Sequence, residues 1–411
     1  MINKLFLEAL QASLKIEKVK WEHDISSENW QELFALAEAQ HVLPMIYDAV
    51  YSCPAAKKSD PKFFSAIKGR VYKKVMLQAM KTEEFLKLYG HLVKNGIRPI
   101  LVKGLICRQL YPNPDYRSSS DEDLLVSADE FVACHKALLE YGMTADPEKS
   151  DVENYDEIAY RKEGSPLYIE LHRSLFAEKS EAYGDFNRFF KAAHQETVTV
   201  SVSGTDINTM SHTLHLLYLI LHAFKHFLHG GVGIRQVCDI SLYANEYGRY
   251  IDWADVTDKC AEVRADKFAF ALIKIGKSCF ELSAEKSCCH AAIYNTDIDE
   301  TYLLEDILSG GVYGGATKGR KHSSNVTLNA VSSQKKGNAV RGSVIRTLLP
   351  SVKKLSGKYK YLEKYPFLLP VAWYDRIVGY IKESRREGGV SEAAKIGKDR
   401  IELLKIYNVI D

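Results

Sequence analysis

Three acidic side chains on two short apolar segments are the residues best suited to do chemistry. Asp121 and Asp123 belong to the segment Asp-Glu-Asp-Leu-Leu-Val, and Glu170 lies in the segment Tyr-Ile-Glu-Leu-His. Both segments predict β-strands, in which side chains two positions apart point to the same face. Glu170 therefore joins the two aspartates if the strands are neighbours. Carboxylates this close repel one another unless a cation lies between them, so the pattern predicts a divalent metal site for Mg²⁺ or Mn²⁺.

The residues that precede the aspartates suit phosphate groups. Lys103 and Gly104 stand where a strand turns into a helix, and glycine lets the backbone approach a phosphate beside free helical N–H groups. Arg117 can form a bidentate contact with phosphate oxygens, and Ser119 adds a hydroxyl donor. Together with metal ions that neutralise a triphosphate, these residues predict an NTP site. The alternative is that residues 121–123 form a charged surface turn, because Asp-x-Asp is a common pattern.

A long helix that begins near Ser211 carries histidines on one face. Four of them are spaced by 7, 4 and 3 residues: His215, His222, His226 and His229. His222 and His226 have the spacing of a zinc-binding pair, but no acidic or Cys ligand completes the set nearby on the helix. The commoner alternative is that the histidines pack against the preceding domain with their polar edges hydrogen-bonded. A third interpretation places four side chains in a cleft that binds the nucleotide phosphates or the acceptor: His222, Lys225, His226 and Arg235.

The elements that must position these residues follow from hydrophobic periodicity. The first 95 residues have a helical period, shown by an apolar stripe at Trp30, Leu33, Phe34 and Ala37. Short apolar runs then predict strands at 97–102, 121–126, 159–161, 167–171 and 197–202, with helices at 105–111 and 129–141. The helical period returns after residue 211, with further helices expected at 236–248, 254–282 and 299–308. This order predicts an α+β fold with a helical region at 1–95, a mixed α/β core at 96–205 and a helical region at 206–411.

These motifs together resemble a known superfamily. A strand, a Gly turn, a short helix, Asp-x-Asp on the next strand and a later strand carboxylate is the layout of the DNA polymerase β-type nucleotidyltransferases. Leu101-Val102-Lys103-Gly104, Leu110-Tyr111-Pro112, Arg117 and residues 121–126 resemble the bacterial "uncharacterised nucleotidyltransferase" family more closely. The spacing of Arg117, Ser119, Asp121 and Asp123 is also similar to that of abortive-infection, type IV toxin nucleotidyltransferases. Segments outside the core extend the resemblance: 33–44, 169–172, His222, His226, Arg235, Asp239 and 365–376.

The resemblance implies a metal-dependent transfer of a nucleoside monophosphate from an NTP to an acceptor hydroxyl, with release of pyrophosphate. The acceptor would be a protein, an RNA or a small molecule. Asp121 and Asp123 would bind the metal and orient the triphosphate, and Glu170 would complete the metal site or act as the base. Leu105 and Glu122 depart from the usual pattern, and Glu122 puts a charge on the face of the strand that should be buried.

Two other functions fit the same residues. One is a non-catalytic module that holds nucleotide or RNA on the same fold. The other is a kinase-like transfer of the terminal phosphoryl group from the same metal site. The sequence contains neither a Gly-x-Ser-x-Gly elbow nor a His-Glu-x-x-His motif, so it gives no support to a serine hydrolase or a zinc protease.

Charge and composition set further limits. The 411 residues include 55 Lys and Arg and 53 Asp and Glu, and no apolar run is long enough to span a bilayer. The stretch from Ile307 to Leu362 holds 11 basic and no acidic residues, and part of it, at about 309–342, predicts a flexible basic loop. This loop is either a flap over the substrate or an ordinary surface loop. The eight scattered cysteines contain no CxxC pair, which favours a reduced, cytoplasmic protein.

Overall fold

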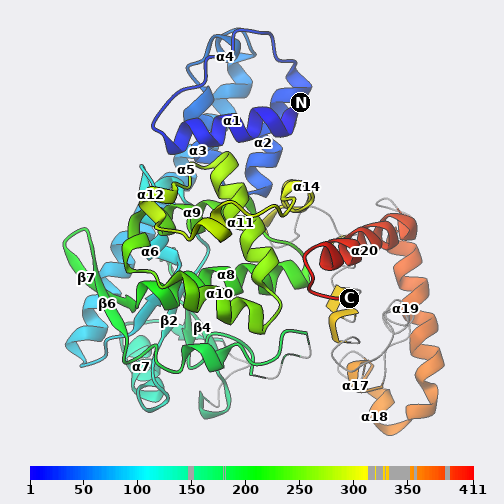
Figure 1. Ribbon diagram of the computed structural model, residues 1–411. Coiled ribbons are helices and arrows are strands. Elements are labelled where there is room, and N and C mark those ends of the chain that lie inside the picture. Colours follow the sequence, from blue (N-terminus) through cyan, green and yellow to red (C-terminus); the bar gives the residue numbers. More distant parts are fainter. Residues whose placement is uncertain are drawn as a thin grey trace.

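The computed structural model is a mixed α+β fold, as the periodicity predicts. It describes residues 1–146, 152–178, 180, 182–312, 320, 327–328, 330–332, 352–355, 359–384 and 389–411. Helices surround one mixed sheet of five strands, and a two-stranded hairpin stands beside it (Figure 1).

The N-terminal region is helical. Its helices are α1 (Ile2–Leu14), α2 (Ser27–Ala39), α3 (Leu43–Val50), α4 (Pro54–Lys57) and the long α5 (Pro61–Lys94). The apolar stripe of α2 faces inward, and all four of its side chains are buried. Ser26 caps α2, because its side chain accepts a hydrogen bond from the Asn29 N–H. The helical prediction for the first 95 residues is confirmed.

The five-stranded sheet positions the acidic residues. Its strands are β1 (Ile100–Val102), β2 (Glu122–Leu125), β3 (Thr144–Ala145), β4 (Glu157–Arg161) and β5 (Tyr168–His172). The strand order is β1-β2-β5-β4-β3, and β2 and β5 run parallel while the other pairs are antiparallel. Helix α6 (Gly104–Arg108) follows β1 and helix α7 (Ala128–Glu140) follows β2. The short β3 was not predicted, because two residues carry no periodic signal.

The register separates the two faces of this sheet. Cross-strand partners have side chains on the same face, so Leu124, Leu171 and Ile158 share one face of the sheet. Helix α7 covers this face, because its His135 forms a hydrogen bond with Tyr160 of β4. Asp123 and Glu170 share the opposite face. The predicted alternation of the β2 strand is thus confirmed, although Asp123 is itself buried at 2% exposure.

Beyond the sheet, the chain forms a hairpin and a second set of helices. Strands β6 (Thr197–Val202) and β7 (Thr205–Met210) make the hairpin, of which β7 was not predicted. The helices are α8 (His212–His229), α9 (Ile234–Tyr247), α10 (Trp253–Glu262), α11 (Asp266–Cys279), α12 (Ala284–Ser287), α13 (Ala291–Tyr294) and α14 (Thr301–Gly310). The single helix expected at 254–282 is wrong: Arg264, with φ of 58°, separates α10 from α11.

The C-terminal part contributes α17 (Val352–Leu355), α18 (Tyr361–Lys364), α19 (Leu369–Ser384) and α20 (Gly389–Ile406), of which α19 and α20 lie to the right in Figure 1. Most of the predicted basic loop lies outside the described residues. Arg320 from that stretch is described, and it forms a buried ion pair with Asp306, which also binds Arg400. None of the described helices combines the length and the apolar character that crossing a membrane requires.

A buried amide joins the N-terminal helices to the C-terminal ones. Gln40, at the end of α2, is fully buried. Its Nε2 donates to the Ile307 carbonyl of α14 at 2.7 Å, and its Oε1 accepts from the Ile234 N–H of α9 at 2.8 Å. Both backbone groups depend on this one side chain, because buried polar groups need a hydrogen-bond partner.

We therefore expect Gln40→Met to destabilise the protein. The substitution keeps the size of the side chain but leaves a buried carbonyl and a buried N–H unpaired, which lowers the free energy of unfolding by about 2–4 kcal/mol. Denaturant unfolding followed by circular dichroism measures the change. Gln31→Met, at an exposed position of α2, is the control and should stay within about 0.5 kcal/mol of the wild type. Equal stabilities for the two variants would contradict the bridging role.

Candidate functional site

Two carboxylates lie side by side on the face of the sheet opposite α7. The parallel pairing of β2 with β5 sets Asp123 directly beside Glu170. The two residues are far apart in sequence. Ile169 and Leu171, on either side of Glu170, turn to the opposite face, and so does Leu124 after Asp123. β2 and β5 are therefore neighbouring strands, as the predicted site requires.

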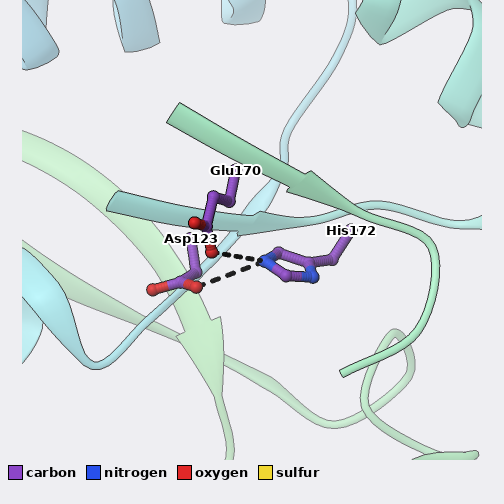
Figure 2. A group of neighbouring side chains, drawn as sticks. All are labelled: Asp123, Glu170 and His172. Atoms are coloured by element: carbon purple, nitrogen blue, oxygen red, sulfur yellow. Dashed lines mark hydrogen bonds and ion pairs between the residues drawn. The ribbon is translucent and has the colours of Figure 1, made fainter. Parts of the chain in front are cut away.

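His172 completes a group of three side chains able to bind a metal. One ligand atom from each of Asp123, Glu170 and His172 lies within 4.8 Å of the other two, and Figure 2 shows the imidazole pointing at both carboxylates. The His172 Nε2 is 3.2 Å from Asp123 Oδ1 and 3.7 Å from Glu170 Oε2. Two carboxylates and one imidazole suit Mn²⁺ or Mg²⁺ completed by water and phosphate oxygens. Asp121 lies outside this group, and its Oδ1 accepts a hydrogen bond from Ser120 Oγ.

Charges within the group balance one another. Burial opposes a charged imidazole, but hydrogen bonds to Asp123 and Glu170 raise the pKa of His172 to about 9. Burial also opposes the charged carboxylate, yet Lys103 and His172 hold the pKa of Asp123 well below its usual range. The Lys103 Nζ is 3.0 Å from Asp123 Oδ2. Asp123 is therefore an anion between two cations at neutral pH.

The three ligands open into a pocket of about 560 Å³. Acidic residues form one wall: Asp121, Asp123, Asp156, Glu157 and Glu170. Basic and imidazole side chains form another: Lys103, His222, Lys225, His226 and His229. Aromatic rings of Phe176, Tyr183 and Tyr218 also line it. The volume suits a nucleotide, and the three kinds of wall suit metal, phosphate and base respectively.

The histidine helix α8 supplies much of the basic wall. His222 Nε2 lies 3.3 Å from Lys103 Nζ and 3.2 Å from His226 Nε2. Burial lowers the pKa of both histidines well below the ordinary value, and the nearby lysines lower it further. Burial also lowers the pKa of Lys225. In the described part of the chain, no further ligand joins His222 and His226 in a group of three, so the zinc interpretation gains no support.

Glu122 occupies the helix end that was expected to bind phosphate. Its Oε2 accepts from the Leu105 N–H of α6 at 2.8 Å, and its Oε1 accepts from Arg108 Nη2 at 2.5 Å. Glu122 and Arg108 are both about 1% exposed, so this is a buried ion pair. Gly104 lacks the Cβ that would overlap with the Glu122 carboxylate. Here the glycine is needed for the approach of a protein carboxylate.

Two predicted phosphate ligands lie behind the pocket wall. Arg117 makes a bidentate ion pair with Asp239, with both contacts at 2.7 Å, and Tyr111 donates to the same carboxylate at 2.8 Å. Arg235 donates through Nη1 to the Ser118 carbonyl. Both arginines line a small cavity of about 20 Å³, which shares Lys103 and His222 with the large pocket. Their roles in phosphate binding stay predictions.

Ser119 also faces protein groups. Its hydroxyl accepts from Arg108 at 2.6 Å and donates to Glu122 at 3.1 Å. Its carbonyl accepts from Lys81 of α5 at 3.2 Å, and its N–H donates to Gln78 at 2.8 Å. The long helix α5 thus holds the loop that leads into Asp121. Of the predicted residues, seven line the large pocket: Lys103, Asp121, Asp123, Glu170, His222, Lys225 and His226.

Several residues of the site have no predicted role. His172 stands two positions after Glu170, and this i+2 spacing on a strand is the signal that places it on the same face. Glu157 and Asp156 had no signal, because their strand is weakly periodic. Lys81 and Gln78 are polar residues within a helix, and nothing in the local pattern distinguishes them from exposed ones.

The comparisons with known proteins agree with this geometry. The family described as "Uncharacterised nucleotidyltransferase" matches residues 26–281, more than half of the chain. The chain belongs to this family of nucleotidyltransferases, enzymes that transfer a nucleotidyl group and therefore use an NTP. A search of curated proteins and a search of solved structures found no match.

We expect Gly104→Ala to be destabilising. An added methyl displaces the Glu122 carboxylate from the Leu105 N–H and disturbs its ion pair with Arg108. The loss of the helix cap and the strain on the buried pair together cost about 2–4 kcal/mol of unfolding free energy. Thermal and denaturant unfolding measure it. Gly90→Ala in α5, where a Cβ would meet nothing within 4 Å, is the matched control and should be neutral or slightly stabilising.

The charge arrangement predicts a pH dependence. The pKa of His172 is raised to about 9 from an ordinary 6.5, so its charge stabilises the folded protein fully below pH 6.5. That contribution disappears as the pH rises through 9. In metal-free protein, NMR titration of the imidazole should show a midpoint near 9, and Asp123→Asn should lower it because a hydrogen-bonding anion is lost.

His215 is the internal control for this titration, because burial lowers its pKa to about 3 and it should stay neutral throughout. A wild-type midpoint for His172 at or below 6.5 would contradict the proposed pairing with Asp123 and Glu170.

Proposed function

We propose that the protein transfers a nucleoside monophosphate from an NTP to an acceptor hydroxyl, on a protein, an RNA or a small molecule, with release of pyrophosphate. The observation that carries the proposal is the pairing of Asp123 with Glu170 beside His172, at the floor of a pocket whose other wall is basic. Carboxylates that face a wall with two lysines, Lys103 and Lys225, suit a metal-bound triphosphate.

Asp123, Glu170 and His172 would hold Mg²⁺ or Mn²⁺, and Asp121 lies in the same pocket to complete the set. A divalent ion bound there would supply charge neutralisation to the triphosphate and to the departing pyrophosphate. Glu170 is more exposed than Asp123, with 23% against 2% of the side chain accessible. It is therefore the carboxylate better placed to accept the proton of an acceptor hydroxyl.

The basic wall would bind phosphate oxygens. Lys103 lies between Asp123 and His222, so a small rotation of its side chain exchanges a carboxylate for a phosphate. Lys225 lies on the same wall, 5.9 Å from the centre of the Phe176 ring. Phe176 and Tyr218 also line the pocket; their ring centroids are 5.7 Å apart and both residues are buried, so a base would meet the edge of this aromatic cluster.

The layout of a Gly turn, Asp-x-Asp and a carboxylate on the neighbouring strand supports membership of the polymerase β-type superfamily and similarity to the type IV toxin enzymes. We further propose the division into regions 1–95, 96–205 and 206–411. A cytoplasmic location agrees with the eight cysteines, which are all free thiols.

A nucleotide-binding module without transfer is the second candidate. Lys103 and His172 already compensate Asp123 at 3.0 and 3.2 Å, so the buried charges are satisfied by protein groups. Such a network is also what a purely structural ion cluster would show.

A labelling experiment separates these functions. The protein is incubated with each of the four NTPs, labelled at either the α- or the γ-phosphate, together with cellular RNA and protein and either MgCl₂ or EDTA. We expect the acceptor to gain the α-label only when Mg²⁺ is present. Transfer of the γ-label instead would identify a kinase, and NTP binding without transfer of either label would identify a binding module.

We expect Asp123→Asn to reduce transfer by about 10³-fold, because a lost metal ligand removes several kcal/mol of transition-state stabilisation. The fold should persist, and Asp121→Asn should also reduce transfer. The labelling assay measures both. Asp206→Asn, the same chemical change at an exposed position of the β6–β7 hairpin, is the control and should keep wild-type activity. Undiminished transfer in Asp123→Asn would remove the metal-site assignment.

A further inference from the structure

The backbone of Lys103 has a conformation that a residue with a side chain rarely adopts. Its φ is 45° and its ψ is −110°, which lies outside the regions favoured by L-residues. Such a conformation persists only where surrounding groups hold it. The residue stands between β1 and α6, and its side chain enters the large pocket.

Two buried side chains hold this backbone from the outer edge of β1. β1 is an edge strand, so its outward backbone groups find no partner within the five-stranded sheet. The Lys103 N–H donates to His215 Nε2 at 3.0 Å. Thr209 Oγ1 donates to the Leu101 carbonyl at 2.7 Å and lies 3.0 Å from His215 Nδ1. Thr209 and His215 are both fully buried.

These contacts determine the tautomer of His215. The Thr209 hydroxyl proton is used by the Leu101 carbonyl, so its oxygen accepts the Nδ1–H of His215. The His215 Nε2 then carries no proton and can accept from Lys103. Burial lowers the pKa of His215 to about 3, which keeps the ring in this neutral form. In the series of hydrogen bonds that runs from the Lys103 N–H through His215 and Thr209 to the Leu101 carbonyl, each donor has one acceptor.

We propose that Thr209 and His215 are positioning residues for the transfer reaction, which place the Lys103 ammonium against Asp123 by holding the Lys103 backbone. The inference rests on the proposed function, and it adds two residues from β7 and α8 that do not line the pocket. Lys103 would otherwise relax to an ordinary conformation, which redirects its side chain. Because Lys103 contacts both Asp123 and His222, a change in its direction alters the acidic and basic walls together.

Thr209→Val tests this chain of hydrogen bonds with little change in shape. The variant lacks the hydroxyl, so the Leu101 carbonyl loses its donor and His215 is free to place its proton on Nε2, facing the Lys103 N–H. Thr209→Ser keeps the hydroxyl and is the matched control. Circular dichroism and thermal unfolding verify that both variants are folded before they are compared.

Two measurements do not depend on catalysis. In ¹⁵N-labelled wild type, NMR should show His215 protonated at Nδ1 and a scalar coupling across the Lys103 N–H···Nε2 hydrogen bond. Acetic anhydride labelling followed by mass spectrometry should show Lys103 reacting slowly relative to the exposed Lys94. In Thr209→Val the coupling should disappear and Lys103 should react several-fold faster, whereas Thr209→Ser should match the wild type.

The catalytic measurement completes the test. Thr209→Val should lower kcat about 10- to 100-fold with little change in the KM for NTP, because a displaced charge weakens the chemical step more than binding. Thr209→Ser should restore kcat. A missing coupling in the wild type, or unchanged Lys103 labelling and kcat in Thr209→Val, overturns the inference. If the wild type transfers no nucleotide but shows the coupling and the labelling change, the proposed function fails and the arrangement of Lys103 stands.

Discussion

The compensation of one buried carboxylate organises the centre of this protein. Asp123 is 2% exposed, and an isolated charge at that depth is strongly unfavourable. Lys103 from the end of β1 and His172 from the end of β5 each contact one of its oxygens. Three segments of the chain therefore meet at one anion. Any cation or phosphate that enters the pocket must compete with, or replace, these contacts.

The sheet register brings these charges together, and the helices complete them. The parallel β2–β5 pairing aligns Asp123 with Glu170 and Leu125 with His172, which puts the ligand atoms on one face. Helix α8 then covers this end of the sheet with imidazole and lysine side chains, and burial lowers the pKa of both His222 and Lys225. The result is a pocket with an anionic and a basic wall, a form well matched to a metal-bound triphosphate. Family membership and pocket geometry point to the same chemistry.

A second buried network supports the first from behind. Glu122 pairs with Arg108, and Arg117 pairs with Asp239, each in a nearly dry environment. A bidentate ion pair and a side-chain helix cap of this kind hold backbone segments in place, and these segments adjoin residues that line the pocket. Glu122 ties the start of α6 to β2, and Asp239 ties α9 to the loop before Asp121. Arg117 and Ser119, which the sequence predicts as phosphate ligands, thus contact protein groups next to the segments that carry Lys103 and the aspartates.

Local patterns in the sequence determined most of the strands and helices and the shared face of Asp123 and Glu170. The alternation in residues 121–126 and 168–172 depends only on neighbouring positions, so it can be recognised in the sequence alone. The pairing partners were not, because Arg117 and Asp239 are separated by 122 positions and Lys103 and His215 by 112. A buried charge binds whichever opposite charge the folded chain brings to it, since desolvation leaves no other stable choice. Only the tertiary structure therefore decided that Arg117 faces Asp239, that Glu122 caps α6 and that His215 holds the Lys103 N–H.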